Sequence, residues 1–277
     1  MKLRQPALPP GWYPRRREIL EDQIRGFLDA AGGIAAGEAR ACVVPHAGWA
    51  FSGNLAALTM GFLDREIKAL AVLGGHLSPG TPLRYGGGDG FQAPNGVIPG
   101  HPGLLSFILE EIPGIEDLPG DNTIEVLLPL VRYFFPDRPV VEIRVPPDSS
   151  ALALGRRLRA WEELTGETLG VVASTDLTHY GPNYGWTPLL GQPPAAVRLW
   201  AKEENDLPFL RALAEGREGE AITQALGRRS ACSPGPAAAA VSFARASGRL
   251  PGRITGYSSS ADIHPSDSFV GYGGVIF

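Results

Sequence analysis

Three apolar runs that each end in a loop with a histidine constrain the fold of this chain more than any other feature. The runs lie at 42–53, 69–76 and 169–181, and each changes abruptly from Val, Leu and Ala to Gly, Pro, Ser or Thr. Such a change is typical of a buried strand that ends at a turn. After the first run, apolar residues recur at three- and four-residue spacing, which predicts a helix. This order of strand, loop and helix favours an α/β fold.

The histidines of these loops are candidates for a site, because ligands of open α/β sheets bind at the carboxyl ends of strands. A right-handed crossover would bring His46 and His76 to the same edge of a parallel sheet. Asp176 and His179 are three residues apart, so both can face one pocket. A carboxylate beside an imidazole raises its basicity and fixes its tautomer, which suits a general base or a metal ligand. The plainer alternative is a capping Asp beside a hydrogen-bonded loop His.

The pattern predicts a single domain over residues 1–277, with a central mostly parallel or mixed β-sheet flanked by helices. Residues 1–17, rich in Pro and Arg, are expected to form an extended N-terminal arm over the body. Residues 78–100, dense in Gly and Pro, are expected to be loops with short strands beside the mouth of the site. Strands are expected at 41–44, 69–73, 140–145, 169–174, 254–261 and 268–277. Helices are expected at 18–31, 54–64, 102–111, 123–134, 152–164, 195–204, 207–215, 221–226 and 237–246.

Charge and hydropathy exclude several classes of partner. The formal net charge of -4 provides no basic field for nucleic acid. No run approaches the roughly 20 apolar residues of a membrane span, and no secretory leader is evident, so a cytoplasmic protein is expected.

The two cysteines, Cys42 and Cys232, are too few for a disulfide scaffold. Cys42 lies within an expected strand and is interpreted as a core residue. Cys232 lies just before a helix, where the dipole favours the thiolate, the form that binds metals. The alternative for Cys232 is a small buried structural residue.

Four stretches together resemble the MEMO family, the AmmeMemoRadiSam system protein B group. They are 45–53, 124–129, 174–181 and 270–272, and the likeness runs in order from about Leu3 to Phe277. The resemblance implies a fold like that of the class III extradiol ring-cleaving dioxygenases, described as LigB-like. Those enzymes hold non-haem Fe(II) with two histidines and a carboxylate, and in the MEMO family a cysteine stands where the carboxylate would be.

Carried over residue by residue, the resemblance implies that His46, His76 and Cys232 are the metal ligands. It also implies that His179 is the acid/base histidine, with Asp176 beside it as a second catalytic residue. Fe(II) is the implied metal, and the softer His₂Cys donor set also suits Cu or Zn.

Four residues within or beside these motifs are expected to line the pocket: Trp49, Asn122, Glu125 and Tyr180. Trp49 stands where the family has Tyr, and Asn122 stands for the His of a Glu-His-Ser-Ile-Glu motif. The segment 73–76 is shorter than the family's Leu-Gly-Pro-Ser-His. These departures from the family pattern count against ring cleavage more than they count against metal binding.

The leading functional hypothesis is a non-haem, metal-dependent oxidoreductase of dioxygenase type that acts on a small, possibly aromatic substrate. One alternative is a binding protein that holds a peptide or small ligand without turnover, and a third is metal-dependent hydrolysis. The family name also implies a functional link to radical-SAM and AMMECR1-type proteins.

Overall fold

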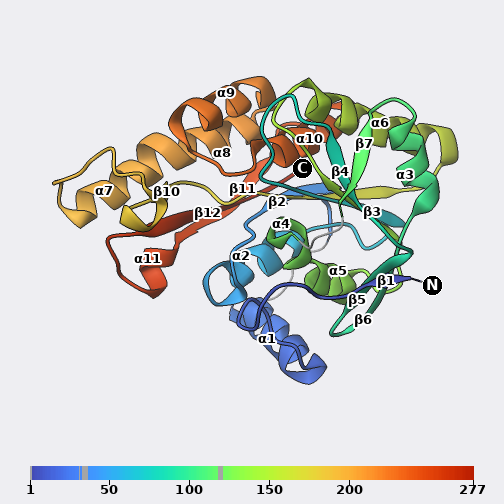
Figure 1. Cartoon of the computed structure of the whole chain (residues 1–277), viewed down its shortest axis with the longest axis horizontal. Coiled ribbons are helices and arrows are strands. Elements are labelled where there is room, and N and C mark those ends of the chain that lie inside the picture. The colour runs from blue at the N-terminus through green and yellow to red at the C-terminus, as the bar shows by residue number, and fades with distance from the viewer. Residues whose placement is uncertain (1, 31, 33–36, 118–120) are drawn as a thin grey trace.

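The computed structural model describes residues 2–30, 32, 37–117 and 121–277. In this part of the chain a nine-stranded mixed sheet lies between layers of helices (Figure 1), which confirms the expected α/β class. The strands of this sheet, in spatial order, are β10 (His179–Tyr180), β12 (Phe269–Ile276), β2 (Ala41–Val44), β9 (Leu169–Ser174), β3 (Ala69–Gly74), β8 (Val140–Arg144), β4 (Leu83–Gly86) and β7 (Gly114–Asp117), with β11 (Arg253–Ser259) paired to β12. A smaller sheet contains β1 (Leu3–Arg4), β5 (Gly90–Ala93) and β6 (Gly96–Pro99).

The centre of the large sheet is parallel. β2, β9, β3 and β8 pair in register, with Val44 opposite Ser174 and Leu73 opposite Ala173. Every residue of β2, β3 and β9 is buried, as expected for near-continuous apolar strands covered on both faces. Because these strands are parallel and in register, Val44, Gly74 and Ser174 end at one edge, and the loops that follow them leave the sheet together.

Antiparallel strands extend this parallel core on both sides. β12 pairs antiparallel with β2, β10 and β11, and β4 pairs antiparallel with β8. The two-residue strand β10 places His179 opposite Val270. The extension therefore fixes the backbone of His179 against β12.

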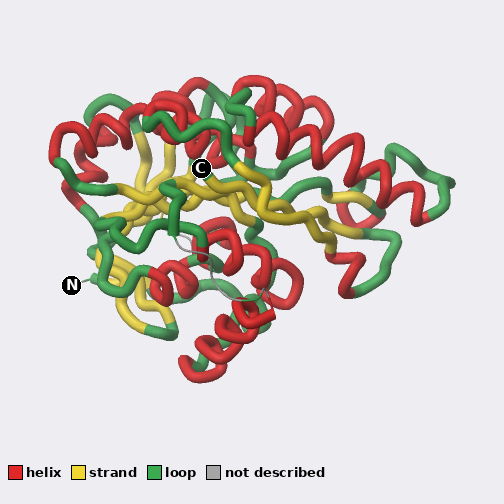
Figure 2. Tube along the Cα trace, turned by 180° about the vertical axis from the view of Figure 1, so that it is seen from behind, coloured by secondary structure: helices red, strands yellow, loops and turns green. Residues whose placement is uncertain are grey.

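Helices cover both faces of the sheet, and Figure 2 shows the strands as a band between them. One core contains residues from α3 (Pro102–Leu109), α6 (Ser149–Thr165), α8 (Leu207–Ala214), α9 (Glu218–Arg228) and α10 (Pro234–Ala246). The other contains residues from α1 (Arg17–Ala30), α2 (Trp49–Gly61), α4 (Asn122–Glu125) and α5 (Leu128–Phe134). The remaining helices are α7 (Pro194–Trp200), α11 (Ser260–Ile263), a 3₁₀ turn at Pro182–Tyr184 and a π-helical segment at Ala201–Asp206. No helix in the described residues has the length and apolar composition that crossing a bilayer requires.

Several element boundaries differ from the expectation. The helix expected at 54–64 begins earlier, at Trp49. The helix expected at 123–134 is divided into α4 and α5, because Pro129 has no N–H to donate to the carbonyl of Glu125. The strand expected at 254–261 ends at Ser259, whose side chain forms a capping box with Asp262 and starts α11.

The N-terminal arm is held in place by a buried carboxylate. Glu125 accepts hydrogen bonds from the N–H groups of Ala7 and Leu8 and from the hydroxyl of Tyr13. Tyr13 is buried, and the carbonyl of Trp12 accepts a hydrogen bond from the first N–H of α2. The arm is therefore part of the packed structure.

Candidate metal centre

His46 follows β2 and is almost fully buried, with 1% of its surface exposed. Its Nδ1 lies 2.9 Å from the Ser174 Oγ, and that hydroxyl donates to the carbonyl oxygen of Thr123 at 2.6 Å. Since a serine hydroxyl has one proton and the carbonyl can only accept, Nδ1 must be the protonated nitrogen. The lone pair of His46 is then on Nε2, which faces Cys232 at 3.2 Å. Burial, followed by the proximity of His76, holds the pKa of His46 well below its ordinary value.

His76 reaches the same place through a turn that requires glycine. Gly75 has a φ of +112°, and a Cβ at this position would lie 2.7 Å from the Cβ of Arg144. The N–H of Gly75 donates to the Thr123 hydroxyl at 2.7 Å, which fixes the turn. The rings of His76 and His46 meet edge to face with centroids 5.2 Å apart. The short turn at 73–76 is therefore sufficient to bring both histidines together.

Cys232 completes the cluster from a distant part of the chain, immediately before α10. Its Sγ accepts a hydrogen bond from the N–H of Asp176 at 3.3 Å, and its own N–H donates to the Asp176 carbonyl. Ligand atoms of His46, His76 and Cys232 all lie within 4.8 Å of one another. Two imidazole nitrogens and one sulfur at this spacing are a donor set for a soft or borderline divalent metal, so these three residues could hold such an ion.

The ionisation of Cys232 differs from the expectation. Burial, and then the charge of Asp176, raises the pKa of this thiol to about 12. Both effects disfavour the expected thiolate in the protein without a cation. A coordinated cation deprotonates a thiol directly. Cys42 is fully buried in β2, and burial raises its pKa also.

Asp176 supports the loop that carries His46. Its carboxylate accepts from the His46 N–H at 2.8 Å, and its other oxygen lies 3.9 Å from His46 Nε2. Burial raises the pKa of Asp176 to about 6, against the opposing effects of the His179 charge and of the amide hydrogen bonds.

His179 is half-buried, and its Nδ1 donates to the Leu177 carbonyl at 2.9 Å. The tautomer of His179 is therefore set by Leu177 and not, as expected, by Asp176. The Nε2 of His179 is left with a lone pair that can accept a proton.

A cavity of about 430 Å³ lies beside these groups. His46, His76, Asp176 and His179 line it, so the structure brings the predicted loop residues to one place. Asn122 also lines it, as expected.

The other three residues expected to line the pocket are buried elsewhere. Trp49 donates from its indole to the Val126 carbonyl, Glu125 holds the N-terminal arm, and Tyr180 stacks on Phe269 at 5.4 Å. Tyr180 lines a separate cavity together with Pro182 and Phe269.

Several cavity residues could not be found from the sequence. Tyr184, Ser260 and His264 also line the cavity, but they belong to segments with no spacing signal that links them to the histidines. Ser174 was visible as the end of an apolar run, and only its contact with His46 shows that it sets the orientation of that ring.

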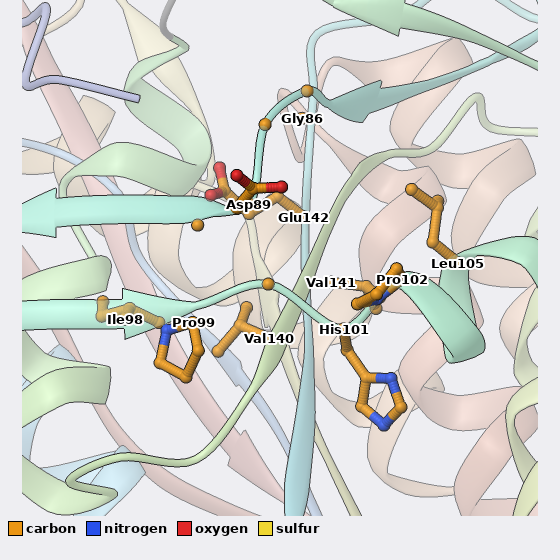
Figure 3. A pocket seen from close by; sticks show the side chains of 14 residues that line it. Gly86, Asp89, Ile98, Pro99, His101, Pro102, Leu105, Val140, Val141 and Glu142 are labelled. Atoms are coloured by element: carbon orange, nitrogen blue, oxygen red, sulfur yellow. The ribbon is translucent and has the colours of Figure 1, made fainter. Parts of the chain in front are cut away.

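The Gly-rich stretch expected beside the mouth of the site lines a different cavity, of about 380 Å³ (Figure 3). Its wall includes Gly86–Gly90, the 98–102 segment and Glu142. Asp89 accepts from the Lys2 N–H, and Glu142 is paired with Arg4. The expectation for 78–100 was wrong in this respect, because the glycine turns pack against the N-terminal strand β1.

The family model and the curated relatives agree on one family. A family model described as "Memo-like protein" matches residues 4–276. A MEMO1 family protein of Thermococcus onnurineus is 27% identical over 299 residues and covers 99% of both chains. Another from Aeropyrum pernix is 28% identical and covers 98% of this chain and 97% of its own. Among solved structures, an uncharacterized protein from Escherichia coli K12 matches with a TM-score of 0.49 and 17% identity, over 85% of this chain and 99% of the other.

Proposed function

This chain belongs to the Memo-like protein family, and from that premise we propose that it is a metal-dependent oxidoreductase of dioxygenase type that acts on a small substrate. The observation that carries the proposal is the approach of His46, His76 and Cys232 ligand atoms to within 4.8 Å beside a cavity that also contains His179. This arrangement combines a metal-type donor set with a proton acceptor.

The residues present fit a metal ion. The tautomer of His46 directs a lone pair at Cys232, and the two histidine rings converge without a hydrogen bond between them. A bound ion supplies a Lewis acid and, where it is redox-active, electrons for oxygen chemistry. We propose Fe(II) from the family resemblance, and the same donors also suit Cu or Zn.

His179 is proposed to move the proton. Its Nε2 carries the lone pair and its side chain lines the cavity, so it can accept a proton from a substrate hydroxyl. Tyr184 packs against the His179 ring edge to face, with centroids 5.0 Å apart, and limits its rotation. Asp176 is proposed to act by positioning, because its carboxylate holds the His46 backbone and its N–H holds the Cys232 sulfur.

Metal analysis of anaerobically purified protein tests the metal site. We expect about one divalent ion per chain in the wild type and little in a His46→Ala, Cys232→Ala double variant. Cys42→Ala is the matched control, because Cys42 is a buried cysteine outside the cluster. Equal metal content in the wild type and the double variant would refute the site.

Oxygen uptake by Fe(II)-loaded protein, across a panel of catechols and aminophenols, tests turnover. A specific observation favours one competing function: Asn122 offers the cavity a neutral amide that cannot exchange a proton at neutral pH. A protein that binds these compounds, consumes no oxygen and retains its metal would be a binding protein.

A further inference from the structure

We propose that the cavity beside the metal centre selects an uncharged aromatic molecule, one that bears no carboxylate, sulfonate or phosphate. The proposal rests on the function proposed above and adds the class of substrate. Three properties of the cavity carry it: a lining without Lys or Arg among the described residues, two asparagines in that lining, and several aromatic rings.

The lining offers no fixed positive charge. Among the described residues that line the cavity there is no Lys or Arg, and Asp176 contributes a carboxylate. Arg144 lies close behind Gly75, next to His76, but its guanidinium is already paired. It bonds Asp117 at 2.6 Å and lies 3.2 Å from Asp121. In the metal-free protein, an anionic substituent would therefore lose water without gaining a Lys or Arg partner, which is costly.

Neutral hydrogen-bonding groups are available instead. Asn122 and Asn183 line the cavity, and in the part of the chain that the structure describes neither side-chain amide forms a hydrogen bond with another residue. Asn183 uses its backbone N–H for Ser268, which fixes its position and leaves the amide unused. Each amide can donate and accept, so it suits a hydroxyl or a carbonyl group.

Aromatic side chains also line the cavity. Phe51 and Tyr184 line the cavity and are 41% and 42% exposed, which is high for large rings. Trp12 and Tyr272 add two further rings to the lining. Exposed rings beside a concave site are typical of a surface that stacks on a flat apolar ligand. The volume of about 430 Å³ lies in the range that holds small molecules.

Calorimetric titration with methyl 4-hydroxybenzoate and 4-hydroxybenzoate tests this selection. The two compounds share a phenol ring and nearly the same shape, and they differ in one negative charge. Metal-free protein is titrated, because a bound cation could itself pair with the carboxylate of the acid. We expect the ester to bind about tenfold or more tightly than the acid, the cost of one unpaired charge.

A charge variant gives a second readout. Asn183→Arg places a cation at the cavity, so the ratio of ester affinity to acid affinity should fall about tenfold. Thr223→Arg, on the exposed side of α9, changes the net charge equally and should leave the ratio unchanged. Circular dichroism of both variants checks their folding.

The outcomes separate this proposal from the proposed function. An ester preference in metal-free protein supports the proposal even if the metal analysis fails, because the readout needs no metal. Equal or tighter binding of the acid by the metal-free protein would overturn it. An equal response of the ratio to both arginine variants, or no measurable binding of either compound, would also overturn it.

Discussion

The buried carboxylate of Asp206 makes a sharp prediction about stability and pH. Asp206 is fully buried at the end of the π-helical segment and accepts from the N–H and hydroxyl of Thr178 and from the hydroxyl of Tyr257. Burial raises its pKa from 3.8 to about 7, although these hydrogen bonds act in the opposite direction. Because Thr178 precedes His179, Asp206 also holds the backbone of the proposed acid/base residue.

The sign of the effect follows from proton linkage. Between pH 4 and pH 7 the folded protein retains a proton on Asp206 that the unfolded chain has released, so this group lowers the free energy of unfolding as pH rises. At about 1.4 kcal/mol per pH unit, ionisation of Asp206 lowers the free energy of unfolding by roughly 4 kcal/mol over this interval. The whole of this destabilisation is present above pH 7. Asp206→Asn mimics the protonated form and is neutral at every pH, so the variant should lack this slope.

The assay is urea unfolding of the wild type and of Asp206→Asn at intervals from pH 5 to pH 9. We expect the free energy of unfolding of the variant to rise relative to that of the wild type as pH increases to 7. Above pH 7 the difference between the two should be constant. Asp29→Asn, at an exposed position of α1, controls for the loss of one carboxylate. A difference between Asp206→Asn and the wild type that stays flat across this range would refute the reasoning.

Four further predictions follow from other contacts. Gly271→Ala would place a methyl group 2.2 Å from the buried carboxylate of Asp206. Thermal unfolding should show a loss of several kcal/mol in the free energy of unfolding, as for other overpacked core substitutions; an unchanged melting temperature would contradict this contact. Glu125→Gln should loosen the N-terminal arm, so limited proteolysis should cut within residues 1–17 much faster than in the wild type; equal cutting would mean that other contacts hold the arm. Ser174→Ala should remove the hydrogen bond that orients the ring of His46, a proposed metal ligand. Metal affinity should then weaken by about 10- to 100-fold in a competition titration, with the fold retained; unchanged affinity would remove Ser174 as a positioning group. In metal-free protein near neutral pH, Cys232 should react slowly with iodoacetamide because burial raises its pKa, bound metal should protect it further at high pH, and Cys42 should stay unreactive throughout; mass-spectrometric mapping that finds Cys232 labelling insensitive to metal would remove it from the ligand set.

The sequence was most informative where the structure is parallel and fully buried. Apolar runs at β2, β3 and β9 can lie only in the interior, so their ends are marked clearly by Pro, Gly and polar residues. Since parallel strands end at a common edge, His46 and His76 could be predicted to meet. Cys232 could be selected from its place before a helix, but its distance to the histidines depends on how α10 packs on the sheet.

Features that depend on tertiary contacts could not be predicted from the sequence. Glu125 in a first helical turn resembles an ordinary partner for the helix dipole, and only the folded arm gives it three donors. The helix expected at 195–204 ends at Trp200 and continues as a π-helix through Asp206. That change of helix type accompanies the burial of Asn205 and Asp206 against Thr178, a contact that no local pattern encodes.

The wide separation of the three proposed ligand residues along the chain also has a consequence for biosynthesis. His46 and Cys232 are 186 residues apart along the chain, and each is held by segments that fold elsewhere. A nascent chain on the ribosome contains both histidines long before the cysteine emerges, so the complete donor set exists only after residue 232 has been translated. Metal occupancy would then report that the chain has reached its final topology, and a captured ion would make departure from that topology less favourable by mass action.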